Sequence, residues 1–358
     1  MATASVVRTA VLEGVSSASG VEVTPAGRVF AVGDDAIYLY ELEADGAGGW
    51  RVAGRFELMA APEGQPKEGI AKKVKPDFEC LTPLPPRGGA AVRVAALGSG
   101  SKSPSRDGMV VVDLAASTPA APVVEALSLT RLYDELRRSG AVLGSAKLNL
   151  EGASLVAGDT TLVLAQRGNV SAVNTLMAMP VGEFEACARD AALPLPPIAI
   201  TRLHLPLLDR WNAGLSGVTT LTLGSVEYLL FAASYEGTDN EIDDGPTLGS
   251  IVGLMRADAL ATAPAGRVGT GGVAAADAEV TPATALIKNA DGTTFIGKVE
   301  GVAALSATLS DDGATAHIRA LAVTDPDGDP SQYVVLDLVL PTGGVAAAGG
   351  AAGGAGSS

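Results

Sequence analysis

The chain contains few of the residues on which many familiar sites depend. Two histidines and two cysteines in 358 residues exclude a histidine-rich zinc or iron site and make no disulfide framework. Aromatic residues are 4% of the chain, so the core must be built chiefly from Val, Leu and Ala. No tryptophan-aspartate repeat signature, Gly-x-Ser-x-Gly elbow or dinucleotide-binding glycine motif occurs.

Positive charge and long apolar runs are also scarce. The formal net charge is −15 and the pI about 4.6, which opposes binding to a phosphate backbone or an anionic membrane surface. No stretch approaches the ~20 apolar residues that span a bilayer, and no secretory signal begins the chain. Two cysteines fit a reducing compartment. We therefore expect a cytoplasmic protein with no nucleic-acid or membrane partner.

A short phrase recurs along the chain: an acid or serine, then a small residue, then an apolar one. The intervals are roughly 60, 72, 65 and 84 residues, which is long enough for a four-stranded blade with insertions. Each phrase is followed by a second recurring pattern, an apolar run that ends in a polar turn. The five copies of the phrase are Ser19-Gly20-Val21, Glu79-Cys80-Leu81, Glu151-Gly152-Ala153, Ser216-Gly217-Val218 and Glu300-Gly301-Val302.

These patterns predict an all-β fold, a β-propeller of five four-stranded blades. Six blades are the alternative if the longest interval hides a degenerate blade. We expect residues 6–12 to complete the sheet built by 318–323 and 333–340, so that the terminal strands close one blade. Two helices are predicted, at 128–139 and 182–190. The domain is predicted to span 1–342, and the Gly/Ala-rich residues 343–358 to form a disordered tail.

Propeller geometry places the predicted site. In a meander the first strand leaves one face and the second returns to it, so the phrase and the polar turn of every repeat lie at the same end of the channel. This would gather Glu79, Glu151 and Glu300 on the axis, with Ser19 and Ser216 completing the circle. Around them we expect Asp34, Asp35, Lys102, Arg106, Arg167, Asn169, Tyr235, Glu236, Asp325 and Asp327.

Three converging carboxylates repel one another unless a cation, a proton or basic groups compensate them. Calcium would suit an all-oxygen ring, and Glu79, Glu151 and Glu300 are its candidate ligands. The other interpretation, which we favour, is a salt-bridge ladder. Lys75 and Lys147 each precede a glutamate by four residues and Lys298 precedes one by two, and even separations share one face of a strand.

Weaker motifs point to ions as well. The run Gly98-Ser99-Gly100-Ser101-Lys102, with Arg106, is rich in backbone donors and positive charge and would suit an anion. A glycine turn with a solvated tip is the favoured interpretation. The acidic turns at 239–245 and 325–329 resemble calcium loops but lack the closing glutamate and helices of an EF-hand, so they need no ion.

Four segments together carry a family resemblance: Lys75-Pro76-Asp77-Phe78-Glu79, Gly98 to Lys102, Leu150-Glu151-Gly152 and Val299-Glu300-Gly301. In these the chain resembles bacterial β-propellers of an uncharacterised, phytase-like family, from about Ser19 to Leu340. The resemblance implies at most what related phytase-like and lactonase-like propellers do, which is to bind calcium in the channel and hydrolyse phosphate or ester substrates.

Two functions follow as hypotheses. The first is a binding or scaffold propeller with an axial glutamate ring, whose partner is a small anionic ligand or a protein. The second is a calcium-assisted hydrolase of a small phosphate or carboxylic ester. In that enzyme the three glutamates would hold the metal and its water, and Lys102, Arg106 and Arg167 would neutralise developing charge. The sequence does not decide between them, nor does it give the ligand or the oligomeric state.

Overall fold

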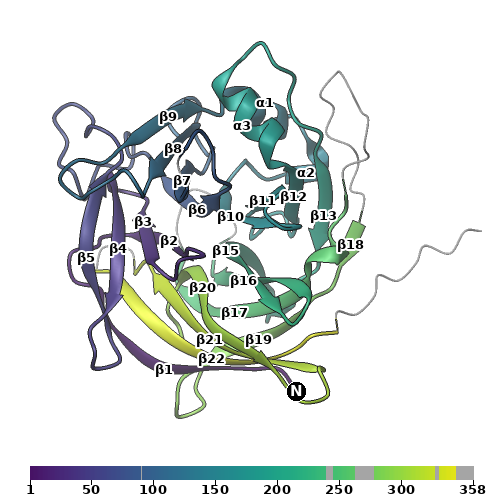
Figure 1. The fold of residues 1–358 in the computed structure, drawn as a ribbon. Coiled ribbons are helices and arrows are strands. Elements are labelled where there is room, and N and C mark those ends of the chain that lie inside the picture. Colours follow the sequence, from purple (N-terminus) through teal and green to yellow (C-terminus); the bar gives the residue numbers. More distant parts are fainter. Residues whose placement is uncertain (90, 239–244, 263–277, 327–329, 344–358) are drawn as a thin grey trace, which may run out of the picture.

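The structure is a computed structural model that describes residues 1–89, 91–238, 245–262, 278–326 and 330–343. The protein is all-β, as the sequence predicts, and its sheets are set around a common centre (Figure 1). Of the predicted tail, residues 344–358 lie outside the described residues. Asp327 and most of the acidic turn at 239–245 also lie outside them.

The first two sheets have four strands each, paired antiparallel in sequence order. Their strands are β2 (Ala18–Val23), β3 (Val29–Gly33), β4 (Tyr38–Ala44) and β5 (Trp50–Glu57), then β6 (Phe78–Leu84), β7 (Arg93–Gly98), β8 (Gly108–Asp113) and β9 (Val124–Ser128). The third sheet contains β10 (Leu150–Val156), β11 (Thr161–Gln166), β12 (Asn174–Pro180), β13 (Ala199–Leu203) and β18 (Ala278–Val280).

A nine-stranded sheet completes the molecule in the order β14-β15-β16-β17-β19-β1-β22-β21-β20. It consists of two antiparallel groups that β1 joins, because β1 pairs antiparallel with β22 and, at Ala4 and Ser5, parallel with β19. Its strands are β14 (Leu207–Leu208), β15 (Trp211–Leu223), β16 (Val226–Glu236), β17 (Thr247–Arg256), β19 (Ala283–Lys288), β1 (Thr3–Val11), β22 (Gln332–Pro341), β21 (Thr315–Thr324) and β20 (Val299–Leu309).

The pairing of the chain ends follows the prediction. The N-terminal strand β1 lies beside β22, and β21 lies beside β22, where the sequence placed residues 318–323 and 333–340. The longest interval between phrases holds β15, β16, β17, β18 and β19. Of these, β15, β16, β17 and β19 belong to the nine-stranded sheet, and β18 joins the edge of the third sheet through β13. The described part of this interval therefore contains no additional sheet.

The strands that contain the recurring phrase, which we call the first strands, form a closed circle at the centre. Each packs against two others, in the order β2, β6, β10, β15, β20 and back to β2 (Figure 1). Because these strands are covered on both sides, β2, β6 and β10 are buried along nearly their whole length. The outer strand β5 alternates between exposed and half-buried residues over most of its length, as expected where one face meets water.

The hydrophobic core is divided among the spaces between neighbouring strand groups. Each of five clusters of buried side chains in the described residues joins two adjacent groups around the circle. Val, Leu and Ala make up most of the clusters, as the low aromatic content predicts. The largest also holds Tyr133 and Phe184, which come from helices. Burial is thus shared by every interface in the circle.

Helices lie at the rim between the second and third sheets (Figure 1). The two predicted helices are present, and the tyrosine hydroxyl of Tyr133 anchors the first by donating to the Gly98 carbonyl at 2.9 Å. Within the described part of the chain, none of the helices has the length and apolar character needed to cross a bilayer. They are α1 (Thr130–Arg137), α2 (Gly140–Leu143), α3 (Val181–Arg189) and the 3-10 helix η1 (Ala257–Ala259).

Candidate axial site

The close packing of neighbouring first strands explains why the middle residue of the phrase is small. A Cβ on Gly301 would lie 2.8 Å from the Val21 nitrogen, and one on Gly217 would lie 3.0 Å from the Gly301 Cα. A Cβ on Gly152 would lie 2.9 Å from the Val218 nitrogen. Neighbouring first strands therefore approach backbone to backbone at these positions, where only glycine fits without a shift.

The polar residue that opens each phrase lies at the same end of the circle. Ser19 donates to the carbonyl of Phe78, and Ser216 donates to that of Val299. Both acceptors come just before the phrase glutamate of the next first strand. The two serines therefore link neighbouring strands. The charged side chains at this end, which we call the axial network, are Asp34, Lys75, Asp77, Glu79, Arg106, Glu151, Arg167, Glu236, Lys298 and Glu300.

In one half of the axial network, Asp77 is the centre. Its carboxylate accepts from Ser99, from Ser101 at 3.0 Å and from Arg106 at 2.8 Å. Lys75 lies 3.1 Å from the other Asp77 oxygen and also pairs with Asp34. Ser99, Ser101 and Arg106 belong to the segment predicted to bind an anion, so a carboxylate of the chain itself occupies it.

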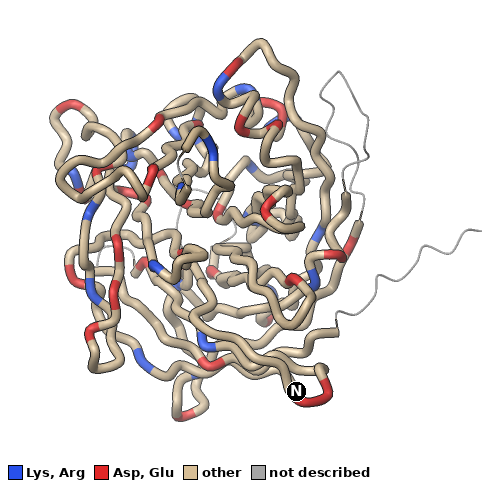
Figure 2. The backbone as a smooth tube through the Cα atoms, in the orientation of Figure 1, with Lys and Arg blue, Asp and Glu red and all other residues tan. Residues whose placement is uncertain are grey.

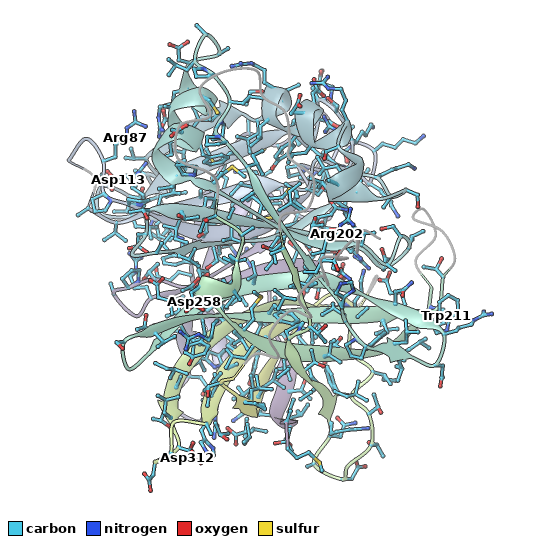
Figure 3. The ribbon with its side chains drawn as sticks, turned by 90° about the vertical axis from the view of Figure 1, so that its right-hand side faces the viewer. Arg87, Asp113, Arg202, Trp211, Asp258 and Asp312 are labelled. Atoms are coloured by element: carbon cyan, nitrogen blue, oxygen red, sulfur yellow. The ribbon has the colours of Figure 1, made fainter. Side chains whose placement is uncertain are left out.

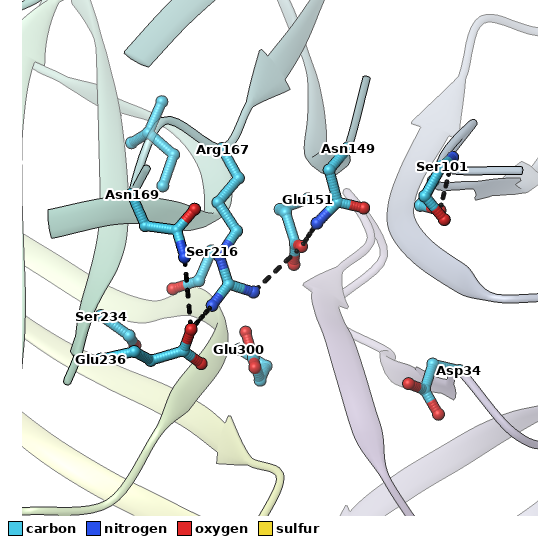
Figure 4. A network of polar contacts seen from close by, with 12 residues as sticks. Asp34, Ser101, Asn149, Glu151, Arg167, Asn169, Ser216, Ser234, Glu236 and Glu300 are labelled. Carbon is cyan, nitrogen blue, oxygen red and sulfur yellow. Dashed lines mark hydrogen bonds and ion pairs between the residues drawn. The ribbon is translucent and has the colours of Figure 1, made fainter. Parts of the chain in front are cut away.

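In the other half, Arg167 lies between two glutamates (Figure 4). Its Nη1 donates to Glu151 at 3.2 Å, and its Nη2 lies 2.5 Å from Glu236. Lys298 bridges Glu236 at 3.2 Å and Glu300 at 2.8 Å. All five side chains are at least nine-tenths buried. Two further amides complete this half, Asn149 donating to Glu151 and Asn169 donating to Glu236 at 3.3 Å.

Negative charge exceeds positive charge in this network. Six carboxylates face four basic groups, so full ionisation leaves two uncompensated negative charges. Within the described residues, no hydrogen bond or ion pair reaches the carboxylate of Glu79, a residue only 9% exposed. One oxygen of Glu79 lies within 4.8 Å of one oxygen of Asp34 and one of Asp77. Glu300 Oε2 is buried and also has no hydrogen-bond partner.

The pKa values follow this imbalance. Burial, followed by the charges of Glu151, Asp77 and Asp34, raises the pKa of Glu79 well above its usual range. Burial also raises the pKa of Glu151 to about 8, although Arg167 opposes the shift. Burial acts the same way on Glu236, but Arg167 and Lys298 outweigh it and hold that pKa below its usual range. At Glu79 and Glu151 burial therefore outweighs the favourable contacts, whereas at Glu236 the two paired bases outweigh burial.

The predicted lysine ladder is present in part. Lys298 pairs with Glu300, as its spacing predicts. Lys75 pairs instead with Asp34 and Asp77. It precedes β6, so the alternation of a strand does not fix its direction. Sequence reasoning named Asp77 only as part of the family resemblance, and its place just before a phrase glutamate was the available signal.

Other predicted residues have separate positions. The Tyr235 ring packs in a hydrophobic cluster and its hydroxyl donates to the Pro206 carbonyl at 2.8 Å, so it does not join the axial network. Lys102 donates to the Lys73 carbonyl at 2.8 Å. Asp35 accepts from Ser16 at 2.7 Å. The side chain of Asp325 borders a cavity beside Lys298.

Two cavities differ in their relation to this network. One of about 550 Å³ borders Lys298 together with Phe295, Ile296 and Asp325. A larger one of about 740 Å³ lies between β11 and β16 and includes Asp258. Figure 3 places Asp258 across the molecule from Trp211, the residue that begins β15. The larger cavity therefore opens away from the end where the first strands start and holds no axial residue.

Residues 14–338 match the model of a family of unknown function (DUF6929). The chain belongs to this family. No curated protein matches its sequence. The match agrees with the predicted resemblance to an uncharacterised family, while the phytase-like part of that resemblance stays a prediction.

Several solved structures are similar in outline. The PQQ-bound aldose sugar dehydrogenase of Streptomyces coelicolor is 14% identical, with 94% of this chain and 98% of that chain covered and a TM-score of 0.41. A protein of unknown function from Dyadobacter fermentans is 9% identical, with coverages of 94% and 99% and a TM-score of 0.36. Virginiamycin B lyase from Staphylococcus aureus is 11% identical, with 94% of this chain and 99% of that chain covered and a TM-score of 0.32. Scores this low carry no conclusion about activity.

Proposed function

We propose that the chain is a five-bladed β-propeller that works as a binding protein and holds one calcium ion on its axis. The five blades would be β2–β5, β6–β9, β10–β13, β15–β17 with β19, and β20–β22 with β1. The closed circle of first strands and the cluster between each pair of neighbouring groups support this count. In this proposal β1 closes the last blade.

One observation carries the calcium proposal: among the described residues, buried Glu79 has no hydrogen-bond or ion-pair partner, and the charge of Lys75 offsets its burial only in part. The electrostatic neighbour of Glu79 across the circle is Glu151, and that of Glu151 is Glu300. A divalent cation among these carboxylates would remove the excess of two negative charges. Calcium accepts carboxylate and carbonyl oxygens in flexible geometry, so the donor set suits it.

The same geometry favours binding over hydrolysis. A hydrolase of phosphate esters needs positive groups that are free to neutralise developing charge. Arg106 and Arg167 are instead paired with carboxylates of the chain, and Lys102 donates to a backbone carbonyl. These contacts support a binding or scaffold protein whose ion stabilises the axis, with a small ligand or a protein as its partner.

Titration calorimetry with calcium on protein freed of metal by a chelator tests the proposal. We expect one site in the wild type and at least tenfold weaker binding in Glu79→Gln, which removes a charge and nearly preserves shape. Glu185→Gln is the matched control, since it removes a buried carboxylate away from the axis, and it should bind normally. No saturable heat in the wild type, or equal binding in Glu79→Gln, would contradict the proposal.

A further inference from the structure

A second buried carboxyl lies deeper in the circle and outside the axial network. Glu22 in β2 and Thr219 in β15 each come two residues after a phrase glycine, and both are buried, at 5% and 2% exposure. The Thr219 hydroxyl lies 3.0 and 3.1 Å from the two carboxyl oxygens of Glu22. The backbone N–H of Val23 donates to the same carboxyl at 2.8 Å.

This contact crosses the centre of the molecule. In the circle of first strands β20 lies between β2 and β15, so Glu22 and Thr219 belong to strands that are not immediate neighbours. The contact therefore ties the first sheet to the group that begins with β15, over an intervening strand. Strands β2 and β10, which are also separated by one strand in the circle, come close to each other as well.

The partners of Glu22 suit a neutral acid better than a carboxylate. One hydroxyl proton cannot satisfy both oxygens, whereas a protonated carboxyl can donate to Thr219 and accept from Val23. An ionised carboxylate without a cation is costly in such a place. Burial raises the pKa of Glu22 to about 8, and the bonds from Val23 and Thr219 only partly oppose the shift.

Charged groups on the surrounding strands do not compensate Glu22. The strands packed against β2 are β3, β6, β10, β15, β20 and β21. In their described residues β3 and β15 carry no charged group, and none of the charges on the others shifts the pKa of Glu22. Those charged or ionisable groups are Glu79, Cys80, Glu151, Glu300, His317 and Arg319.

We propose that Glu22 is a proton-operated strut, which holds the first sheet to β15 as a neutral acid and loosens that link when it ionises. Between pH 4.5 and 8 the folded chain keeps a proton that the unfolded chain releases. This contribution to stability is complete below pH 4.5 and falls as pH rises through about 8. The strut does not depend on the calcium proposal, since it uses none of the proposed ligands.

Thermal unfolding from pH 5 to 9 tests the strut, with chelator present so that metal plays no part. Glu22→Gln keeps the shape and cannot ionise, so the wild type should lose on the order of 5 °C relative to it across this range. Glu183→Gln, an exposed change in α3, should run parallel to the wild type. Parallel profiles for Glu22→Gln and the wild type would overturn the proposal.

A direct titration covers the case in which Glu22→Gln does not fold. Thr219→Val removes the hydroxyl and nearly keeps the volume. Because the Thr219 bond partly opposes the effect of burial, its loss should raise the pKa of Glu22 further and keep the pH dependence at least as large as in the wild type. In the wild type, ¹³C NMR of labelled glutamate carboxyls should show buried resonances that titrate near pH 8 for both Glu22 and Glu151, and the resonance that shifts in Thr219→Val is that of Glu22. The absence of any resonance that titrates near pH 8 and responds to Thr219→Val would also overturn the proposal.

Discussion

Two networks of acidic and basic side chains in this protein have opposite charge balance. On the axis, carboxylates exceed basic groups by two. At the rim, three arginines surround two glutamates, in what we call the rim network: Arg87, Arg93, Glu125, Glu185 and Arg189. There Arg93 makes two bonds to Glu185, at 2.8 and 3.1 Å, and Arg189 makes one at 2.7 Å.

The pKa values of Glu185 at the rim and of Glu151 on the axis move in opposite directions. Burial raises the pKa of Glu185, but the arginine bonds outweigh it and hold that pKa below its usual range. At Glu151 on the axis burial prevails and raises the pKa to about 8, whereas Arg167 and Lys298 hold the pKa of Glu236 below its usual range. Figure 2 shows both signs of charge interspersed around the molecule. A satisfied network indicates a structural role, and an unsatisfied one indicates a missing cation or proton.

Removing one arginine from each network gives the largest predicted effect. Arg167→Met leaves Glu151 without its ion pair and Glu236 with Lys298 alone, and should lower the free energy of unfolding by about 3–5 kcal/mol. Arg189→Met should lower the free energy of unfolding by about 1 kcal/mol, because Glu185 keeps its ion pairs with Arg87 and Arg93. Urea denaturation measures both. Equal losses would mean that the axis is no more dependent on its bases than the rim.

Adding one methyl group compares packing in the two regions. Gly301→Ala places Cβ 2.8 Å from a backbone nitrogen, which cannot move away as a flexible side chain would. It should lower the free energy of unfolding by about 1–3 kcal/mol. Gly182→Ala in α3 has no atom within 4 Å of the new Cβ, and should be neutral or stabilise by up to about 1 kcal/mol. A tolerated Gly301→Ala would contradict the close approach of the first strands.

The smallest effect should come from the exposed edge of the rim network. Glu125 pairs with Arg189 at 2.7 Å, but its side chain is 46% exposed. Glu125→Gln should change the free energy of unfolding by about 0.5 kcal/mol or less, and less still at high salt. Denaturation at low and high ionic strength measures this. A loss above 1 kcal/mol would show that the rim network depends on Glu125.

The sequence predicted the strands better than the contacts of the site. Repeated phrases revealed which strands meet, because the glycine in four of the five phrases lies where neighbouring strands pack closely, with backbone contacts at Gly152, Gly217 and Gly301. They also placed Glu79, Glu151 and Glu300 at one end. Which base pairs with which acid was less predictable. Lys75 lies outside its strand, and Asp77 next to it has a φ of +60°, so local alternation does not apply.

Pairings between distant segments were also beyond sequence reasoning. For the glycine-rich segment with Arg106 the favoured prediction was a solvated turn and the alternative an anion site, yet the Asp77 carboxylate bonds to it from 22 residues away. Glu22 carried no local signal, because its partner Thr219 is 197 residues distant. Such contacts depend on the circle of strands closing, which no local pattern encodes.

Anomalous diffraction from calcium-soaked crystals tests the central claim most directly, since it locates an ion without assuming its ligands. We predict one peak on the axis, about 2.3–2.6 Å from oxygens of Glu79 and at least one of its neighbours Glu151 and Glu300. No peak there at saturating calcium would contradict the account, and protonation of these carboxyls would then have to balance the charge.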